Sequence, residues 1–456
     1  MSTPSIDPQT ARWLGYVDDL RRRPETPFTE QWERFNAIYG GRDPSLPPPP
    51  AWLPEVERIE RANLTALMRG LGLPDYAALH RWSVAHRAEF WQRTIARLGI
   101  VFAREPDGIL DLAAGPLQPR WLPGARLNIV DSCFRPPACT VAAVVGREGG
   151  EALDLVTYGE LEALVNRVAG GLVAQGFRPG DAIALYMPMT LECVAAYLGI
   201  IRAGCAVVSI ADSFAAAELA RRLEIAGAAA VITVASFTRG GRRIALFDTV
   251  RTARAPRAVV IAGPDGEHPE LRDGDIHWDD FLADDTVFTS LTAEPSKITN
   301  ILFSSGTTGD PKAIPWTQLT PLKCAMDAHF HHDLQPGDVI AWPTNIGWMM
   351  GPWLIYAALV NRACLALYEG LPSGRDFADF VARAGVSVLG VVPSLVRAWR
   401  EGGACEGVDW SRIRTFSSTG EPSNRRDFLW LMSRSGYRAP VIEYCGGTEI
   451  GGGYLT

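Results

Sequence analysis

Residues 180–210 read GDAIALYMPMTLECVAAYLGIIRAGCAVVSI, and they decide the fold class of this chain. Within them AIALYMP (182–188) is a compact apolar run followed by a turn, which predicts a buried strand. TLECVAAYLGIIRAG (190–204) predicts a helix that ends at Gly204, and CAVVSI (205–210) predicts the next strand. A strand, a covering helix and a second strand in this order are typical of a parallel sheet.

The same alternation continues toward the C-terminus, and helices precede it. AAAELARRLEIAG (215–227) predicts a helix and AAVITVA (229–235) a strand. On the N-terminal side, residues 75–100 carry apolar side chains at helical spacing. We therefore predict an α/β domain (residues 136–456) with mixed or parallel sheets covered by helices, preceded by a helical segment (residues 1–135) packed on it.

Residues 339–361 carry no charged side chain, and their length would suffice to span a bilayer. Pro343, Gly347 and Pro352 interrupt the run, so we predict a strand, a loop and a buried helix, and no membrane span. The N-terminus lacks the basic-then-apolar pattern of a secretory signal, which predicts a cytoplasmic protein.

The composition is that of a globular protein, with 47% hydrophobic and 21% charged residues in a chain of 456. The net charge of −7 argues against a nucleic-acid partner, which usually requires a strongly positive surface. Only three of the 44 basic residues are lysines, namely Lys297, Lys312 and Lys323. We interpret this ratio as the coding bias of a GC-rich, bacterial genome, in which a retained lysine is a candidate for a role that arginine cannot fill. For Lys297 and Lys323 we prefer chance survival.

Neither cysteines nor histidines are spaced as in a structural metal site. The eight cysteines form no CxxC pair, so we expect reduced and mostly buried thiols. His329, His331 and His332 precede a turn at Pro336-Gly337, and we interpret them as surface histidines at a helix end rather than as a metal site.

The strongest chemical signal is Ile301-Leu-Phe-Ser-Ser-Gly-Thr-Thr-Gly-Asp-Pro-Lys312, an apolar strand that runs into a Gly/Ser/Thr loop and a lysine. Such a loop offers bare backbone N–H groups, several hydroxyls and one cation, which recognition of a polyphosphate needs. It is not a Walker A loop, because Pro311 precedes the lysine and Ala313 follows it. The alternative is a polar turn between two strands.

Two further segments are rich in small residues, Phe416-Ser-Ser-Thr-Gly-Glu-Pro422 and Ile442-Glu-Tyr-Cys-Gly-Gly-Thr-Glu-Ile-Gly-Gly-Gly453. In the second, Tyr444 has a ring that can stack on a base, and Thr448 has a hydroxyl that can bond a phosphate oxygen. Glu449 is a hard oxygen ligand suited to Mg²⁺ held between protein and phosphates. Singly, each segment is equally consistent with a glycine-rich turn between a strand and a helix.

Together and in this order, the three segments resemble the ANL superfamily of adenylate-forming enzymes. SSGTTGDPK (304–312) resembles the family's phosphate loop, TGEP (419–422) its adenine-contacting segment, and YCGGTE (444–449) its aromatic-x-x-x-Thr-Glu motif. LVTYGELEALVNRVAGGL (155–172) and residues 180–210 are similar to two earlier motifs of the family.

Within the superfamily the chain resembles the acetyl-CoA synthetase branch, through RLNIVDSCF (126–134), YMPM (186–189) and VITVASFTRGGRRI (231–244). The similarity covers most of residues 75–456. It implies the large N-terminal domain of such an enzyme, with helix-covered sheets and a β-barrel-like subdomain.

The resemblance implies an ATP-dependent acyl-CoA synthetase that acts in two steps. A carboxylate attacks the α-phosphorus of ATP and gives an acyl adenylate and pyrophosphate, and the thiolate of CoA then displaces AMP to give a thioester. Cation and N–H stabilisation is needed because an anion approaches a polyanion. The cofactors and co-substrates implied are ATP/AMP, Mg²⁺ and CoA.

Residue roles follow from the same resemblance. Lys312, Thr448 and Glu449 are the implied catalytic residues, with Glu449 as the Mg²⁺ ligand. Arg239 and Arg242 are implied to contact the CoA phosphates, the alternative being a solvated basic loop. The implied nucleotide-binding residues are Ser304, Ser305, Gly306, Thr307, Thr308, Gly309, Lys312, Gly420, Glu421, Pro422, Glu443, Tyr444, Cys445, Gly446, Gly447 and Thr448. The implied acid pocket comprises Trp348, Met349, Met350, Thr419 and Gly446.

The chain departs from the acetyl-specific pattern at two positions. Gly446 stands where those enzymes place an indole that closes the acyl pocket, and Met350 stands where they have a threonine that contacts CoA. We therefore expect an acid larger than acetate, such as a medium-chain, aryl or terpenoid acid, with a role in natural-product biosynthesis.

The chain ends a few residues after the Thr-Glu motif, whereas family members continue into a small C-terminal lid with the adenylation lysine. We interpret the chain as the large domain alone, impaired as a catalyst in this form. Two alternatives stay open, an adenylation domain that loads an acyl carrier protein and a non-catalytic acyl-adenylate or nucleotide binding module.

Overall fold

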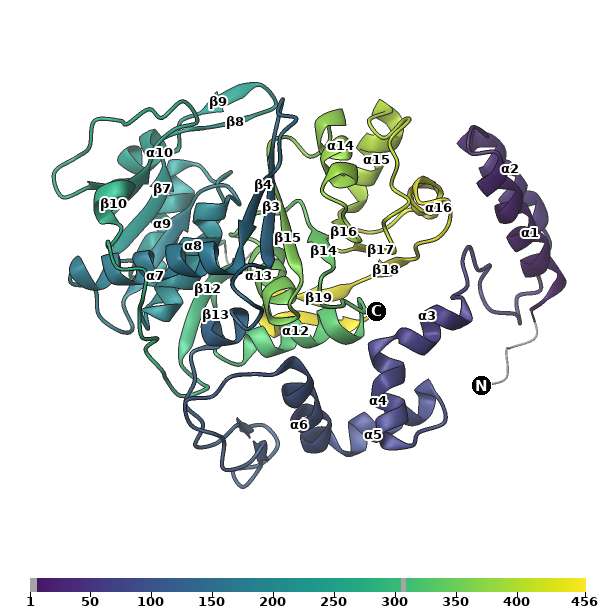
Figure 1. The fold of residues 1–456 in the computed structure, drawn as a ribbon, viewed down its shortest axis with the longest axis horizontal. Coiled ribbons are helices and arrows are strands. Elements are labelled where there is room, and N and C mark those ends of the chain that lie inside the picture. The colour runs from purple at the N-terminus through teal and green to yellow at the C-terminus, as the bar shows by residue number, and fades with distance from the viewer. Residues whose placement is uncertain (1–5, 305–308) are drawn as a thin grey trace. The chain divides into compact units, whose positions relative to one another are not determined.

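The computed structural model describes residues 6–304 and 309–456 (Figure 1). The chain divides into two compact units. The first unit comprises Met1–His86, Pro372–Cys445 and Leu455–Thr456, and the second comprises Arg87–Leu371 and Gly446–Tyr454. Residues 87–135 belong to the second unit, and a part of the expected large domain joins the N-terminal helices in the first.

The second unit contains an open seven-stranded sheet in the order β11-β10-β7-β5-β6-β12-β13. Neighbouring strands are parallel except for the antiparallel pair β12–β13. The strands are β5 (Ala182–Tyr186), β6 (Ala206–Ile210), β7 (Ala230–Val234), β10 (Ala258–Ile261), β11 (Ile276–His277), β12 (Ile298–Ser304) and β13 (Lys312–Thr317). The helices between them are α8 (Leu191–Arg202), α9 (Ala216–Ala226), α10 (Leu246–Thr252) and α11 (Trp278–Phe281).

A smaller group of strands in the second unit has the order β14-β15-β3-β4, with only β3–β4 antiparallel. Its strands are β3 (Val141–Arg147), β4 (Asp154–Thr157), β14 (Val339–Ala341) and β15 (Cys364–Glu369). The accompanying helices are α6 (Arg87–Leu98), η1 (Ile129–Cys133), α7 (Tyr158–Ala174), α12 (Thr320–Phe330) and α13 (Met350–Val360).

Short two-stranded ribbons complete the second unit. They are β1 (Leu110–Asp111) with β2 (Arg120–Trp121), β8 (Phe237–Arg239) with β9 (Arg242–Ile244), and β19 (Cys445–Gly447) with β20 (Gly452–Leu455). The turn η2 (Thr448–Ile450) joins β19 to β20. The predicted fold class, with mixed and parallel sheets covered by helices, is confirmed, and the β-barrel-like subdomain stays a prediction.

The first unit consists of N-terminal helices and a later β-α segment. The helices are α1 (Pro8–Arg22), α2 (Phe28–Ile38), α3 (Val56–Arg61), α4 (Asn63–Leu71) and α5 (Tyr76–Ala85). The later segment contains α14 (Arg375–Arg383), β16 (Val388–Val391), α15 (Pro393–Gly402), β17 (Thr415–Ser418), α16 (Arg425–Arg434) and β18 (Val441–Glu443). β17 pairs in parallel with both β16 and β18.

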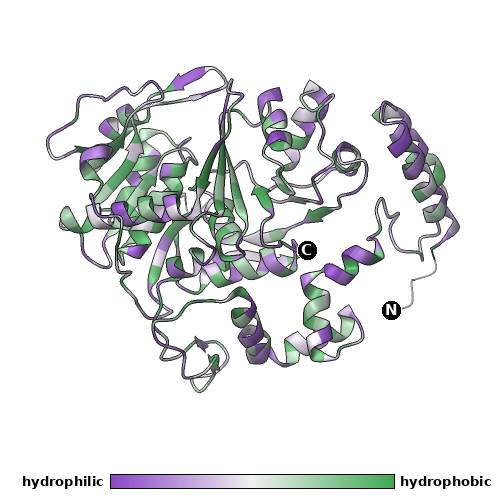
Figure 2. Ribbon diagram, viewed as in Figure 1, coloured by the Kyte–Doolittle hydropathy of each residue, from purple (hydrophilic) through white to green (hydrophobic). Residues whose placement is uncertain are grey.

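Local sequence explains where the elements begin and end. Thr157 starts α7 with a capping box, in which its hydroxyl accepts from the N–H of Glu160 and the Glu160 carboxylate accepts from the N–H of Thr157. Thr190 caps α8 in a similar way. The hydropathy follows the layers, because green strands lie inside the second unit while the hairpin strand β9 is purple (Figure 2).

The sequence predictions for the core of this unit are confirmed. The strands and helices expected between residues 182 and 235 are β5, α8, β6, α9 and β7, each within a few residues of its predicted ends. The charge-free run contains the strand β14, a loop and the fully buried helix α13, as predicted. Of the helices in the described residues, none combines the length and the apolar character that a membrane span requires.

Candidate functional site

The hairpin β12–β13 presents the two ends of the phosphate-loop segment side by side. Ser304 at the end of β12 lies opposite Lys312 at the start of β13. Lys312 is exposed, and no ion pair joins it to another described residue. The Asp310 carboxylate takes two hydrogen bonds of 3.2 Å from Arg221 of α9. Ser305, Gly306, Thr307 and Thr308 lie outside the described residues.

The Thr-Glu turn η2 packs against this hairpin within the second unit. The indole Nε1 of Trp316, a buried residue of β13, donates a 2.8 Å hydrogen bond to the carbonyl oxygen of Thr448. Thr448 is half-buried and the Glu449 side chain is exposed. The fold thus brings together two segments that are more than 130 residues apart, and it leaves the Glu449 carboxylate accessible to a cation.

The predicted adenine-contacting residues form a second group, within the first unit. The N–H of Tyr444 donates to the carbonyl oxygen of Ser418 at 2.8 Å, and the Thr419 hydroxyl donates to the carbonyl oxygen of Tyr444 at 2.6 Å. Gly420 follows with a positive φ of +89°, a conformation that favours glycine. The ends of β17 and β18 are therefore joined where the sequence predicts a nucleotide contact.

The carboxylates of Glu421 and Glu443, two further residues of this group, accept hydrogen bonds from serines of the first unit. Glu421 accepts hydrogen bonds of 2.8 Å from both the N–H and the hydroxyl of Ser394 at the start of α15. The Glu443 carboxylate accepts from the hydroxyl of Ser423. The Tyr444 side chain is only 1% exposed, so its ring is covered in this structure rather than open for stacking on a base.

The predicted acid-pocket residues come from both units. Trp348 is 52% exposed and its ring centroid lies 6.0 Å from that of Phe214, next to Met349 and Met350 at the start of α13. Thr419 belongs to the first unit. At Gly446 an added Cβ would lie 2.0 Å from the carbonyl oxygen of Gly452, so this position is filled by close backbone packing.

The hairpin β8–β9 carries the two arginines that are implied to contact CoA, and Arg239 and Arg242 pair across it. Arg239 donates to the Asp212 carboxylate at 2.7 Å, and the Asp212 side chain is only 3% exposed. Arg242 is exposed. The carboxylate of Asp212 thus holds one arginine in place, while the other remains accessible.

A single carboxylate anchors the tip of that hairpin. Glu148 accepts backbone N–H bonds from Gly240 at 2.9 Å, Gly241 at 2.8 Å and Leu371 at 2.8 Å. Burial by itself would raise the pKa of Glu148, but the three N–H donors outweigh it and lower the pKa below its ordinary value. The residue is therefore charged at neutral pH and holds the hairpin by charge-assisted bonds.

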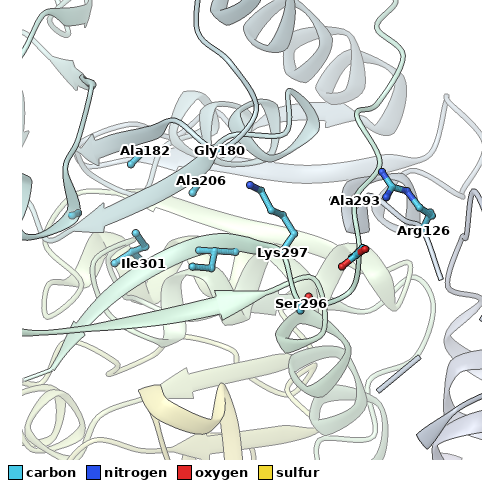
Figure 3. A pocket seen from close by; sticks show the side chains of 11 residues that line it. Arg126, Gly180, Ala182, Ala206, Ala293, Ser296, Lys297 and Ile301 are labelled. Atoms are coloured by element: carbon cyan, nitrogen blue, oxygen red, sulfur yellow. The ribbon is translucent and has the colours of Figure 1, made fainter. Parts of the chain in front are cut away.

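A cavity of about 640 Å³ lies elsewhere in the second unit, next to Lys297. Its lining includes Ala182, Ala206 and Ile298, the first residues of β5, β6 and β12. Figure 3 shows Lys297 extending toward Gly180 and Ala206. This cavity is at the amino ends of the strands, whereas the phosphate loop follows the carboxyl end of β12, so it is separate from the predicted nucleotide site.

Sequence reasoning was wrong about the histidines and missed the residues around them. His332 is fully buried, and its Nδ1 lies 3.2 Å from the carbonyl oxygen of Asp327. His329 and His331 are half-buried, so the three histidines do not form an exposed group at the helix end. Asp327 is itself buried and bonded to Lys323. An acidic residue and a lysine spaced four apart in an otherwise apolar helix were the available signal. No cluster of metal-ligating side chains occurs in residues 6–304 and 309–456.

Two protein-family models match the sequence of this chain. The model described as AMP-binding enzyme matches residues 138–456, and that described as acetyl-coenzyme A synthetase N-terminus matches residues 76–133.

Individual relatives are longer than this chain. A hexanoyl-CoA synthase of Cannabis sativa is 42% identical over 98% of this chain and 65% of its own length. The probable acyl-activating enzyme 17, peroxisomal, of Arabidopsis thaliana is 42% identical over 95% of this chain and 63% of its own length. The solved structure of an acetoacetyl-CoA synthetase from Streptomyces lividans has a TM-score of 0.80 and 28% identity, covering 89% of this chain and 66% of that one. The chain thus spans just under two thirds of the length of these relatives.

Proposed function

Because this chain belongs to the family of AMP-binding enzymes, we propose that it forms the large domain of an ATP-dependent acyl-CoA synthetase. The enzyme activates a carboxylic acid larger than acetate as its acyl adenylate and passes the acyl group to CoA. The observation that carries this proposal is the packing of the Thr-Glu turn against the phosphate-loop hairpin, with the Trp316–Thr448 hydrogen bond between them.

The proposed reaction places specific demands on this chain. In the first step an oxygen of the acid forms a bond to the α-phosphorus of ATP while the bond to pyrophosphate breaks. Lys312 and the hydroxyls and N–H groups of the phosphate loop would neutralise the leaving polyphosphate. Thr448 would donate to an oxygen of the α-phosphate. In the second step the CoA thiolate attacks the acyl carbon and AMP leaves.

Magnesium is part of this proposal, and the residues present fit it. Mg²⁺ is usually held by one or two carboxylates plus substrate phosphates, so a dedicated cluster of protein ligands is not required. The exposed Glu449 carboxylate, next to the phosphate-loop hairpin, would supply the protein ligand. The ion would add positive charge against the phosphates when bound.

Coenzyme A is the proposed acyl acceptor. Arg242, which is exposed on the β8–β9 hairpin, would contact the CoA phosphates, and Arg239 would orient the hairpin through Asp212. Two of the relatives have names that specify a CoA thioester, and nothing in the comparisons supports a carrier protein as acceptor.

The acid is proposed to be larger than acetate on the strength of the relatives, because the close approach of Gly446 to Gly452 leaves no open space at the position of the missing indole. The hexanoyl-CoA synthase supports a medium-chain acid as the first candidate. A role in natural-product biosynthesis, a bacterial source and a cytoplasmic location are further proposals. The two relatives nearest in identity given above are plant proteins, and one is named as peroxisomal, so they do not support the bacterial source.

Calorimetry with AMP and with a hexanoyl-sulfamoyl adenosine mimic tests the proposal. We expect both to bind, the mimic more tightly because it resembles the adenylate intermediate. Thr448→Val removes the hydroxyl at nearly constant volume and should weaken both, while Lys297→Met, in the separate cavity, is the matched control. If well-folded protein binds neither compound, the proposed nucleotide site is excluded. Thioester formation by the full-length protein then separates an enzyme from a non-catalytic binding module.

A further inference from the structure

One face of α12 is occupied by the segment that follows the Thr-Glu turn. Thr320, Lys323, Cys324 and Asp327 are spaced by three, one and three residues, which places them on one side of a helix. All four contact the glycine segment, defined here as Gly451–Gly453, which runs directly on from Thr448 and Glu449.

The centre of the contact is an ion pair that binds both backbone groups of one glycine. The Asp327 carboxylate accepts the N–H of Gly453 at 2.8 Å and is bonded to the Lys323 ammonium through both oxygens at 2.5 Å. The same ammonium donates to the carbonyl oxygen of Gly453 at 2.8 Å. The three N–H donors of the Lys323 ammonium therefore have three acceptors, the two carboxylate oxygens of Asp327 and the carbonyl oxygen of Gly453.

That arrangement explains why a lysine stands here in a chain that otherwise uses arginine. An ammonium is a compact charge with three donors around one atom, whereas a guanidinium spreads its donors over a planar fork. Arginine could pair with Asp327, but a planar fork is poorly shaped to reach the Gly453 carbonyl from the same point. The chance survival preferred for Lys323 on sequence grounds does not account for these contacts.

Close approach of the two backbones requires the glycines. A Cβ on Gly452 would lie 2.4 Å from a carboxylate oxygen of Asp327, and one on Gly451 would lie 2.1 Å from Cγ2 of Thr320. Gly451 also has a φ of +58°. The Cys324 thiol donates to the carbonyl oxygen of Gly451 at 3.1 Å.

The Thr-Glu turn is thus held on two sides. Trp316 bonds the carbonyl oxygen of Thr448 from β13, and Lys323 with Asp327 holds the chain five residues later from α12. The Asp327 side chain is 0% exposed and that of Lys323 is 25% exposed. A largely buried ion pair of this kind is weak evidence for stability but can fix a register. What it fixes here is the strand β20, and with it the position of the Thr448 hydroxyl and the Glu449 carboxylate.

We propose that Lys323 and Asp327 are positioning residues for the acid-activation step, and that they act by placing Glu449 and Thr448 against the nucleotide phosphates. The inference rests on the proposed function, in which Glu449 binds Mg²⁺ and Thr448 contacts the α-phosphate. Some residues orient a metal-binding side chain without touching the metal. Replacing such a residue typically lowers metal affinity or activity by about 10- to 100-fold.

The test uses the full-length protein and pyrophosphate exchange at varied Mg²⁺. For Lys323→Met we expect kcat to fall roughly tenfold or more and the half-saturating Mg²⁺ to rise by a similar factor. The KM for the acid should change less than about twofold, since that substrate does not touch the pair. Lys323→Arg, which keeps the charge, should restore part of the loss. Lys297→Met is the matched control and should leave all parameters unchanged.

The Mg²⁺ concentration at half-saturation distinguishes a positioning role of Lys323 from a merely structural one. Loss of folded protein lowers the maximal rate but does not change the Mg²⁺ concentration at half-saturation. An unchanged Mg²⁺ requirement in folded Lys323→Met would therefore overturn the proposal. If that variant does not fold, Lys323→Arg and Asp327→Asn are measured by the same criterion. Glu449→Gln tests the premise that Glu449 binds Mg²⁺, and an unaltered Mg²⁺ requirement in this variant refutes that assignment. A changed Mg²⁺ requirement in Glu449→Gln but not in Lys323→Met refutes only the positioning role of Lys323.

Discussion

His332 is an ionisable side chain without exposed surface, and this makes stability depend on pH. Burial lowers its pKa from 6.5 to about 4, with the nearby Lys323 and His331 charges acting in the same direction and Asp327 opposing them. The imidazole of His332 therefore binds more protons in the unfolded chain than in the folded chain between about pH 6.5 and 4. The contribution of His332 to stability is present above pH 6.5 and is lost as the pH falls through this window.

We predict that the free energy of unfolding falls by about 3 kcal/mol between pH 7 and pH 4 on account of His332. His332→Asn should flatten this acid limb, whatever its effect at neutral pH, because an amide does not titrate. Urea unfolding at a series of pH values measures the slope. The exposed His80 provides the control, since His80→Asn should leave the slope unchanged. An identical acid limb in His332→Asn would contradict the buried neutral imidazole.

Gly446 illustrates a residue whose role cannot be read from its identity. From the sequence, the missing side chain indicates an open acyl pocket. The structure places the Gly446 backbone so close to Gly452 that a Cβ would lie 2.0 Å from the Gly452 carbonyl oxygen. Which main chain would fill the space beside a glycine depends on the pairing of β19 with β20, and no local pattern encodes that pairing.

We predict that Gly446→Ala already disturbs the site. The added methyl must displace backbone, which costs about 1–3 kcal/mol, and the displaced strand leads into the Thr-Glu turn. Acid activation should therefore fall with short and long acids alike, measured as kcat/KM across a series from acetate to decanoate. Gly402→Ala at the end of α15, where nothing lies within 4 Å of the added Cβ, is the control. A selective loss of the long acids would instead restore the pocket interpretation.

At the scale of elements, the central strands and helices of the second unit could be predicted, because hydrophobic periodicity is a local signal. The strands from β5 to β7 and the buried helix α13 are examples. The hydrogen bonds that join one element to another could not be predicted, since they depend on residues far apart in sequence. Glu148 joins the end of β3 to the tip of the β8–β9 hairpin more than 90 residues later, and nothing in its neighbourhood distinguishes it from other surface glutamates.

We predict that Glu148→Ala releases the β8–β9 hairpin and weakens use of CoA. Three charge-assisted N–H bonds are lost together, and each unsatisfied donor costs about 1–3 kcal/mol unless water replaces the carboxylate. The KM for CoA should rise roughly tenfold, which corresponds to 1.4 kcal/mol, while pyrophosphate exchange stays unchanged. Glu105→Gln, an exposed glutamate of the same unit, is the control. A loss of pyrophosphate exchange as large as the loss with CoA would show that the hairpin serves the nucleotide step instead.

At the scale of the whole molecule, the sequence indicated a helical N-terminal segment packed on the main domain, but not which part of that domain it would contact. The chain leaves the first unit after residue 86 and returns to it at residue 372, so this unit is built from segments nearly 300 residues apart. Its core joins Trp13 and Phe35 of the N-terminal helices to Tyr437, with the Trp13 ring 5.4 Å from that of Tyr437. Periodicity predicts an apolar face on each helix, but it does not specify which distant segment covers that face.

This discontinuous core connects the N-terminal helices to the strands that we propose contact the adenine. Trp13 is fully buried, and Gln31 of α2 accepts a 2.7 Å hydrogen bond from the Tyr437 hydroxyl, just after α16. From there the chain enters β18, which ends at Glu443 and leads to Tyr444. Removing an indole from such a core usually costs about 3–5 kcal/mol. Trp13→Ala should therefore loosen α16 and β18 rather than the helix α1 alone.

We predict that Trp13→Ala weakens AMP binding without any contact between Trp13 and the nucleotide. Hydrogen exchange should accelerate in α16 and β18, and remain unchanged in β5, β6 and β12 of the second unit. Calorimetry should show a higher Kd for AMP. Tyr76→Ala, at a residue of α5 that is 61% exposed, is the matched control within the same unit. If exchange quickens only in residues 8–38 and AMP binds as before, the N-terminal helices are a separate layer that does not support the adenine-contacting strands.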